Sequence, residues 1–455
     1  MSGAARNWIA LWAVAVALGA QALLGFSAFP IADDFSYAPL AEVWADPGLY
    51  PRDDLLRGIA NHAWAYNAVY WLAKATVGVG AGFWAAAVAL SVASVMALHA
   101  IMVRVGAAGF ALPLAVAAGI MVLAPGVGRG LIGGYVGSFF HPQWIALTLV
   151  MWAFVAVLGG RTVPAGLALA AAAYAQPMSA LHGSLAIAVA CATQGRAGLR
   201  RLAIIGAVAV AAALPYEIFI IATALDAPAA PVPAARLIED AYLFFSPHRY
   251  QPAMPFLLLG WGYLALGLIS VAILRRVRPA EATIALGLLC GLGALHGVTT
   301  ALYVAAESRY LPLYILDATR SSPLFFALAA TLFAAAIEQR VEAGLTGAGW
   351  GSPTALAATV ATGAAGLAIL ALNATSAGWF FALSGPLLIS APGRAIPKAA
   401  LAVMLAGTFG WTTYHLHLQP PVAPQRASLF GWAARQTSRD ALFIVPPGMY
   451  DFRLY

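Results

Sequence analysis

Long runs of apolar residues alternate with short polar segments along almost the whole chain of 455 residues. Runs near 20 residues long have the length of a helix that crosses a membrane. The first, at 8–29, predicts an uncleaved membrane-spanning helix rather than a signal peptide. The segment 164–193 is predicted either as a helical hairpin or as one kinked helix. Counted as a hairpin, the predicted spans lie at about 8–29, 81–103, 109–124, 144–160, 164–176, 178–193, 201–225, 255–274, 281–306, 318–337, 353–373, 376–392 and 398–415.

The composition supports this interpretation. Hydrophobic residues make up 62% of the chain and charged residues 9%, whereas soluble domains carry about 25% charged residues. We therefore predict an all-α polytopic transmembrane bundle of about 11–13 spans, with a layer of short interface helices on its outer face. Membrane lipids are expected partners. No basic-aromatic nucleic-acid module is present, so a nucleic-acid partner is not expected, and no oligomeric state is predicted.

The placement of charge predicts the orientation in the membrane. With the N-terminus in the cytoplasm, the inner segments hold 12 basic and 3 acidic residues, and the outer segments hold 12 basic and 13 acidic residues. An excess of Arg and Lys marks cytoplasmic loops. The chain is thus predicted to be an integral protein of a bacterial inner membrane, with its C-terminus outside. The inner basic residues are Arg6, Arg104, Arg161, Arg196, Arg200, Arg201, Arg275, Arg276, Arg278, Arg340, Arg394 and Lys398.

The predicted organisation is one transmembrane domain followed by a tail. The domain covers 1–415 and includes two long outer loops, 30–80 and 226–254. The tail, 416–455, contains a strand-like segment, "ALFIV", which has nothing to pair with and is read as the start of an incomplete outer domain. Long outer loops over a helical base predict that binding or chemistry takes place on the outer side.

The first outer loop holds six of the 17 acidic residues of the chain: Asp33, Asp34, Glu42, Asp46, Asp53 and Asp54. Pro39 is predicted to start a short helix, "PLAEVWA", that ends at the turn "DPG", where Asp46 has a turn role. Pro51 is predicted to start a second helix that continues to Val77. Asp53 and Asp54 fall in its first turn, where acids complement the helix dipole. This second helix places His62, Tyr66 and Tyr70 on one face, as in an amphipathic helix at a membrane interface.

Asp33 and Asp34 directly follow the first predicted span. A carboxylate at the boundary between membrane and water is desolvated on one side, which raises its pKa and suits it to act as a base. Alternatively, an Asp at a helix start caps the helix and complements its dipole.

Several outer basic residues are candidate ligands for an anionic group. "FFSPHRYQP" at 244–252 contains His248 and Arg249, which can hold a phosphate or belong to an aromatic interface belt. Arg309 and Arg320 lie at outer span ends, as phosphate ligands or as membrane anchors. His141 precedes a span at an "HP" step and is a candidate for a water-lined site.

Two further polar residues lie inside apolar segments. For His182, in "YAQPMSALHGS", a packed and hydrogen-bonded histidine is the favoured interpretation. Glu217 follows Pro215 in "ALPYEIFII". An acid within a span is a functional hypothesis by default, here a proton or cation site.

The acids "ADD" at 32–34, in a large outer loop after the first span, resemble those of the GT-C superfamily of integral-membrane glycosyltransferases. The segment 137–183, "GSFFHPQWIALTLVMWAFVAVLGGRTVPAGLALAAAAYAQPMSALHG", is similar to the paired helices of that family, joined by a short basic inner turn. The resemblance implies transfer of a sugar from a polyprenyl-phosphate carrier to an acceptor on the outer face.

By this resemblance Asp33 or Asp34 is the catalytic base, and Arg249, Arg309 or Arg320 holds the carrier phosphate. Glu239 and Asp240 in "IEDAY" are the best substitute for a second acidic pair. A divalent cation such as Mg²⁺ or Mn²⁺, held by Asp33 and Asp34, is an optional cofactor. The alternatives are a secondary transporter or lipid flippase centred on Glu217, and a membrane assembly or scaffold subunit.

Overall fold

A computed structural model of the chain describes residues 34–46, 48, 63–107, 142–225, 254–305, 316 and 318–342. Every element in these ranges is a helix, so the predicted all-α class is confirmed for them. The spans predicted at 8–29, 109–124, 353–373, 376–392 and 398–415, and the tail, lie outside this part. The elements are α2 (Asp34–Ala45), α4 (Trp64–Thr76), α5 (Val79–Arg104), α7 (Pro142–Leu158), α8 (Thr162–Ala175), α9 (Pro177–Ala192), α10 (Gly195–Leu225), α13 (Met254–Leu274), α14 (Pro279–Ala305), η4 (Ala318–Ser321) and α16 (Ser322–Glu342).

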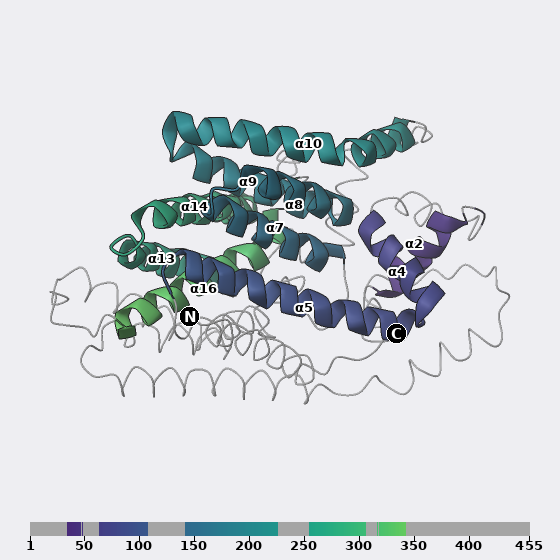
Figure 1. Cartoon of the computed structure of the whole chain (residues 1–455), viewed down its shortest axis with the longest axis horizontal. Helices are drawn as coiled ribbons and strands as arrows, with labels where there is room; N and C mark the ends of the chain where they lie inside the picture. The colour runs from purple at the N-terminus through teal and green to yellow at the C-terminus, as the bar shows by residue number, and fades with distance from the viewer. Residues whose placement is uncertain are drawn as a thin grey trace.

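The long helices pack side by side as a bundle (Figure 1). In the described part, three stretches are long and apolar enough to cross a membrane: Val79–Arg104, Gly195–Ala222 and Pro279–Leu302. Shorter apolar helices accompany them at Pro142–Leu158, Thr162–Ala175, Pro177–Ala192 and Gly260–Leu274. This part of the chain is therefore an all-helical bundle with membrane-spanning helices.

Residues 162–192 form two helices. The backbone at Gln176 is extended, with φ −161° and ψ 102°, and Pro177 is the first residue of α9. Proline suits the first helical position because its missing N–H has no partner there in any case. The side chain of Gln176 accepts a hydrogen bond from the backbone N–H of Ser179 at 2.8 Å. The "QP" step thus ends one helix and caps the next.

The direction of α10 shows that this pair is a hairpin. A Cβ at Gly166, early in α8, would overlap Val208 of α10. Later in α8, the Tyr174 hydroxyl donates to the Ala212 carbonyl of α10 at 3.2 Å. Residue numbers rise together along both helices, so α8 and α10 are parallel. The helix between them, α9, must run the opposite way, so the kinked-helix alternative is excluded.

The described arginines of the predicted inner loops gather at one end of the bundle, called here the arginine-rich end. The side chain of Arg104 lies against Gly159 after α7, and those of Arg278 and Gln339 lie against Gly106 after α5. Gln339 also donates a hydrogen bond to the Gly106 carbonyl. Because successive helices alternate in direction, the same end carries Arg161, Arg196, Arg200, Arg201, Arg275 and Arg276. This one-sided distribution is the pattern that positive-inside topology requires.

Small residues allow α14 to approach its neighbours closely. A Cβ at Gly287 or Gly291 would overlap the backbone of Ala190 or Ala186 in α9. Such small-residue contacts replace the hydrophobic driving force, which is weak between helices in lipid. The order of the contacts makes α9 and α14 antiparallel, which again places the start of α14 at the arginine-rich end.

Two short helices, α2 and α4, form a layer at the opposite end of the bundle (Figure 1). Trp64 of α4 contacts Tyr174 near the end of α8 and Tyr216 and Phe219 in the last part of α10. Both α8 and α10 begin at the arginine-rich end, so their C-terminal parts lie at the other. We call the pair the α2–α4 layer.

The structure corrects two boundaries predicted for this layer. The helix predicted to start at Pro39 already includes Asp34, so α2 extends at least five residues further toward the N-terminus than the signal from Pro39 indicates. The helix predicted from Pro51 to Val77 is not continuous, because Ala63 has a non-helical backbone with φ −136° and ψ 56°. Packing of Trp64 on the spans redirects the chain there.

A third correction concerns the face of α4 predicted to lie at the membrane interface. Tyr66 and Tyr70 are buried. Their rings pack edge-on against Phe83 of α5, with centroids 5.3 Å and 6.0 Å away. Burial against protein thus replaces contact with lipid on this face.

Candidate functional site

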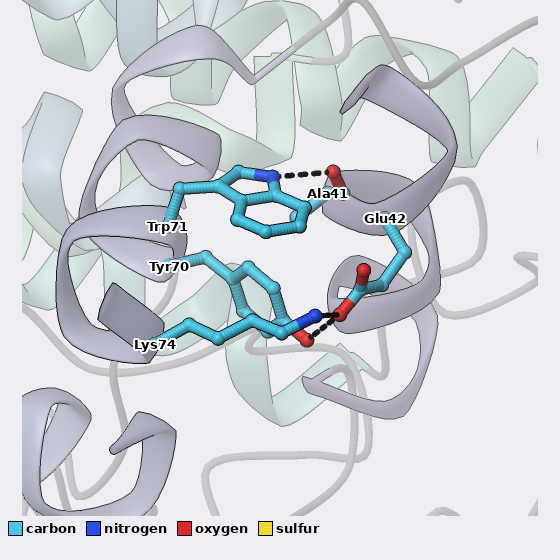
Figure 2. Close-up of polar contacts among 5 residues, drawn as sticks. All are labelled: Ala41, Glu42, Tyr70, Trp71 and Lys74. Atoms are coloured by element: carbon cyan, nitrogen blue, oxygen red, sulfur yellow. Dashed lines mark hydrogen bonds and ion pairs between the residues drawn. The ribbon is translucent and has the colours of Figure 1, made fainter. Parts of the chain in front are cut away.

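Polar side chains join the two helices of the α2–α4 layer (Figure 2). Glu42 of α2 accepts hydrogen bonds at Oε1 from the Tyr70 hydroxyl and from Lys74 Nζ, each at 2.5 Å. One residue earlier, the Ala41 carbonyl accepts a hydrogen bond from Trp71 Nε1 at 2.8 Å. Three donors of α4 therefore bind two neighbouring acceptors of α2. We call these five residues the α2–α4 clamp.

The clamp combines an ion pair with aromatic packing. Lys74 forms a salt bridge with Glu42, and its ammonium also lies 4.4 Å from the ring centroid of Trp71. The Glu42 side chain is 25% exposed and that of Lys74 is 43% exposed. Partial burial strengthens the pair relative to a fully exposed one, which contributes little because water screens it.

The pKa of Glu42 lies below its ordinary value. Burial acts in the opposite direction and raises the pKa, and it is the largest single influence. The hydrogen bonds from Lys74 and Tyr70, together with the Lys74 charge, outweigh it because they stabilise the carboxylate. Glu42 is therefore ionised at neutral pH, and it is suited to holding structure rather than to accepting a proton.

The α4 side of the clamp is fixed to the bundle. Tyr70 is 6% exposed and packs against Phe83 of α5 and against Trp71. At the start of α4, the Trp64 ring lies 5.4 Å from Tyr216 and 5.1 Å from Phe219, measured between centroids. Edge-to-face aromatic contacts of this kind favour one ring arrangement. The donors of the clamp thus have defined positions relative to the spans.

The predicted acids of the first loop divide into three groups. Asp34 is the first residue of α2, where an acid favours the helix dipole. The carboxylate of Asp46 accepts a hydrogen bond from the backbone N–H of Gly48 at 3.0 Å, so its predicted turn role is confirmed. Asp33, Asp53 and Asp54 lie outside the described residues.

Arg320 lies in η4, which packs against α9 and α14. The His182 ring of α9 makes a hydrogen bond from Nε2 to the Leu316 carbonyl, 2.8 Å away and just before η4. His182 is fully buried, so its predicted structural role is confirmed. Because α9 starts at the end away from the arginines, Arg320 lies at the same end as the α2–α4 layer.

Two buried hydroxyls lie on helices that contact η4, the element that holds Arg320. Ser322 starts α16 two residues later, and Ser179 lies one helical turn before His182. Both side chains are buried, and neither Oγ has a hydrogen-bond partner in the described part of the chain. Buried polar atoms usually have a hydrogen-bond partner, so we expect these two Oγ atoms to have one as well. The other predicted basic and acidic ligands, His141, His248, Arg249, Arg309, Glu239 and Asp240, lie outside the described residues.

Glu217 does not lie at the middle of its helix. It follows Tyr216 in the last third of α10, and Tyr216 contacts Trp64 of the α2–α4 layer. Pro215 lies within α10 but does not interrupt it. Glu217 is half-buried near the end of the span, in contrast to the midplane position expected for a transport site.

No group of three or more His, Cys, Asp or Glu side chains able to hold a metal ion occurs among the described residues. Asp33 lies outside them. A divalent cation held by Asp33 and Asp34 therefore stays a prediction.

The sequence interpretation missed Glu42 as a site residue. It counted Glu42 among the loop acids but assigned it no role. One signal was available, because Tyr70 and Lys74 are spaced i, i+4 and therefore share a face of α4. The partner of that face could not be identified, because α2 and α4 meet only through tertiary packing.

Comparison of the chain with protein-family models, with curated proteins and with solved structures found no match. The described part of the chain is an all-helical bundle with helices long and apolar enough to cross a membrane and a polar layer at one end.

Proposed function

We propose that this protein is a GT-C-like membrane glycosyltransferase with about 11–13 spans. It moves a sugar from a polyprenyl-phosphate carrier to an acceptor on the outer face of a bacterial inner membrane, with the N-terminus in the cytoplasm. Support comes above all from one observation. The α2–α4 layer, Asp34 and Arg320 gather at the end of the bundle opposite the arginine-rich end, which is the outer end under the positive-inside rule.

The chemistry requires a base and a site for the leaving phosphate. The acceptor hydroxyl oxygen attacks the anomeric carbon of the sugar while the bond from that carbon to the phosphate oxygen breaks. Asp33 or Asp34 takes the hydroxyl proton, and the carrier leaves as polyprenyl phosphate with the bonding electron pair. Arg320, with Arg249 or Arg309, stabilises the developing negative charge. The buried hydroxyls of Ser179 and Ser322 are suitable further donors to phosphate oxygens.

The proposal is tested with the double substitution Asp33→Asn and Asp34→Asn. Membranes containing this variant are supplied with polyprenyl-phosphate hexoses and pentoses carrying a radiolabelled sugar, and labelled glycan products are measured. We expect transfer to fall at least 100-fold, the contribution typical of a general base. The matched control is Asp46→Asn, an acid of the same loop with a turn role, which should keep wild-type transfer. Wild-type transfer by a folded double variant would exclude the assigned base.

A secondary transporter or lipid flippase centred on Glu217 ranks second. Glu217 is half-buried in a helix that spans the membrane, which favours a functional role. Its place near the end of α10 favours the transferase over the transporter. Substitution of Glu217 by Gln distinguishes the two, because loss of activity there with full activity in the Asp33 and Asp34 variants would support transport.

A further inference from the structure

Among the described residues, the clamp joins α2 to α4 through three hydrogen bonds. Its two acceptors, the Ala41 carbonyl and the Glu42 carboxylate, lie next to each other in the second half of α2. Figure 2 shows the three donor side chains of α4 reaching toward this short stretch from one side. The contact therefore holds α2 at one place along its length.

This arrangement makes α2 a lever, in the sense that a tilt of the helix at the clamp moves its far end. Asp34, the first residue of the helix, precedes Glu42 by eight positions, which is about 12 Å along a helix axis. A tilt of about 10° at the clamp would move the Asp34 end by about 2 Å over that length. Misplacement of a reacting group by about 1 Å can cost a factor of about 100 in rate. Small changes at Glu42 are thus amplified at the other end of the helix.

The fixed side of the lever is also defined. Tyr70 is buried against Phe83 of α5, and Trp64 joins the start of α4 to α8 and α10. The position of α4 is therefore set by three helices of the bundle. A change at the clamp should move α2 while α4 and the spans keep their places.

We propose that Glu42 is a positioning residue that, through Tyr70, Trp71 and Lys74, fixes α2 so that Asp34 meets the acceptor. This inference rests on the proposed function, because it assigns Asp34 to the reaction. It adds a role for Glu42 that is separate from base catalysis. Glu42 does not touch the substrate, and it acts through the helix that carries Asp34.

The first part of the test does not depend on any activity. Hydrogen exchange of the α2 amides is measured for the purified full chain in lipid nanodiscs, as wild type and as Glu42→Ala, Tyr70→Phe and Lys74→Met. We expect α2 amides to exchange roughly tenfold faster in Glu42→Ala, since a charge-assisted hydrogen-bond pair is lost. Exchange in α5 and α8 should stay unchanged. The control is Thr76→Ala, which removes a hydrogen bond within α4 only. Unchanged α2 exchange in all three clamp variants would overturn the clamp.

The second part measures transfer kinetics with the same proteins. Glu42→Ala should lower kcat about tenfold or more with little change in KM, because substrate binding is kept while the base is misplaced. Lys74→Arg, which keeps the charge, should recover most of the activity lost in Lys74→Met. Faster α2 exchange with wild-type kcat would overturn the positioning role and leave the proposed function standing. Absence of transfer by the wild type would overturn the proposed function and the positioning role together, while exchange still decides whether the clamp holds α2.

Discussion

At the scale of single residues, the hydrogen-bond partners of the first-loop acids show which of them have a structural role. Asp46 closes a turn on the Gly48 backbone, and Glu42 joins two helices through Tyr70 and Lys74. Neither carboxylate is available as a base in these arrangements. In the proposed function Asp33 or Asp34 is the base, and Glu42 is proposed to hold the helix that carries Asp34.

The lowered pKa of Glu42 predicts a pH dependence of stability. A carboxyl with a lowered pKa contributes stability that is fully present above its unfolded-state pKa and is lost as pH falls through the folded-state pKa. The groups that face Glu42 from α4 are Tyr70 and Lys74. Thermal unfolding of wild type and Glu42→Gln should differ at pH 7 by about 1 kcal/mol or less, because the pair is partly exposed.

This difference should close as the pH falls through the lowered pKa of Glu42, where the carboxyl of the wild type takes up a proton. The chain has 17 acidic residues, so both proteins lose stability in acid, and only the difference between them reports on Glu42. A difference that stays constant from pH 7 to pH 3 would contradict the assigned ionisation.

At the scale of elements, close approach between helices depends on a few small residues. His296 of α14 is buried, its Nε2 donates a hydrogen bond to the Leu257 carbonyl 3.0 Å away, and its ring stacks on that of Phe325 in α16. Its ring occupies the space above Gly260 of α13, where a Cβ would overlap it. Helices α13, α14 and α16 thus meet around one buried histidine.

Gly260→Ala should therefore destabilise the protein by about 1–3 kcal/mol, the usual cost of overpacking a core. The matched control is Gly297→Ala in α14, where the nearest contact of a Cβ is an ordinary 3.8 Å to Trp261. That substitution should be neutral or stabilising, because Ala is favoured over Gly in a helix interior. The free energies of unfolding of both variants are measured in the same detergent. Equal values would contradict the prediction and show that the His296 ring moves aside at little cost.

Helix positions were more predictable than helix partners. The apolar runs at 81–103 and 281–306 fall within two residues of the observed bounds of α5 and α14, because apolar length is a local property. The "QP" step left a kinked helix open as an alternative to the hairpin, since a helix can bend or end at such a step. The clamp was not predictable either, because Glu42 and Lys74 are 32 positions apart and only packing brings them together.

At the scale of the whole molecule, charge separates the two ends of the bundle. The described inner-loop arginines lie at one end, and Arg320, Lys74 and the α2–α4 layer lie at the other. We propose from the positive-inside rule that the layer lies on the outer side. The opposite orientation would put the proposed base and phosphate ligands in the cytoplasm.

Single-cysteine labelling in intact cells tests this orientation. In a background with Cys191 and Cys290 replaced by Ala, one variant carries Asp46→Cys beside α2 and the other carries Arg200→Cys at the arginine-rich end. Both positions are exposed. A membrane-impermeant thiol reagent should label the first variant in intact cells and the second only after the membrane is permeabilised. The reverse pattern would show that the layer faces the cytoplasm.

The central proposal is that the chain transfers a sugar from a lipid phosphate carrier. Its most direct test is the ratio of the two products that the purified protein forms in proteoliposomes. The measurement follows two products from a radiolabelled polyprenyl-phosphate sugar in the presence of a membrane extract that supplies acceptors. We predict that the wild type forms glycosylated acceptor and free polyprenyl phosphate in equal amounts, and that the Asp33→Asn, Asp34→Asn variant forms neither. Intact donor after incubation with folded wild-type protein, across hexose and pentose donors, would contradict the account.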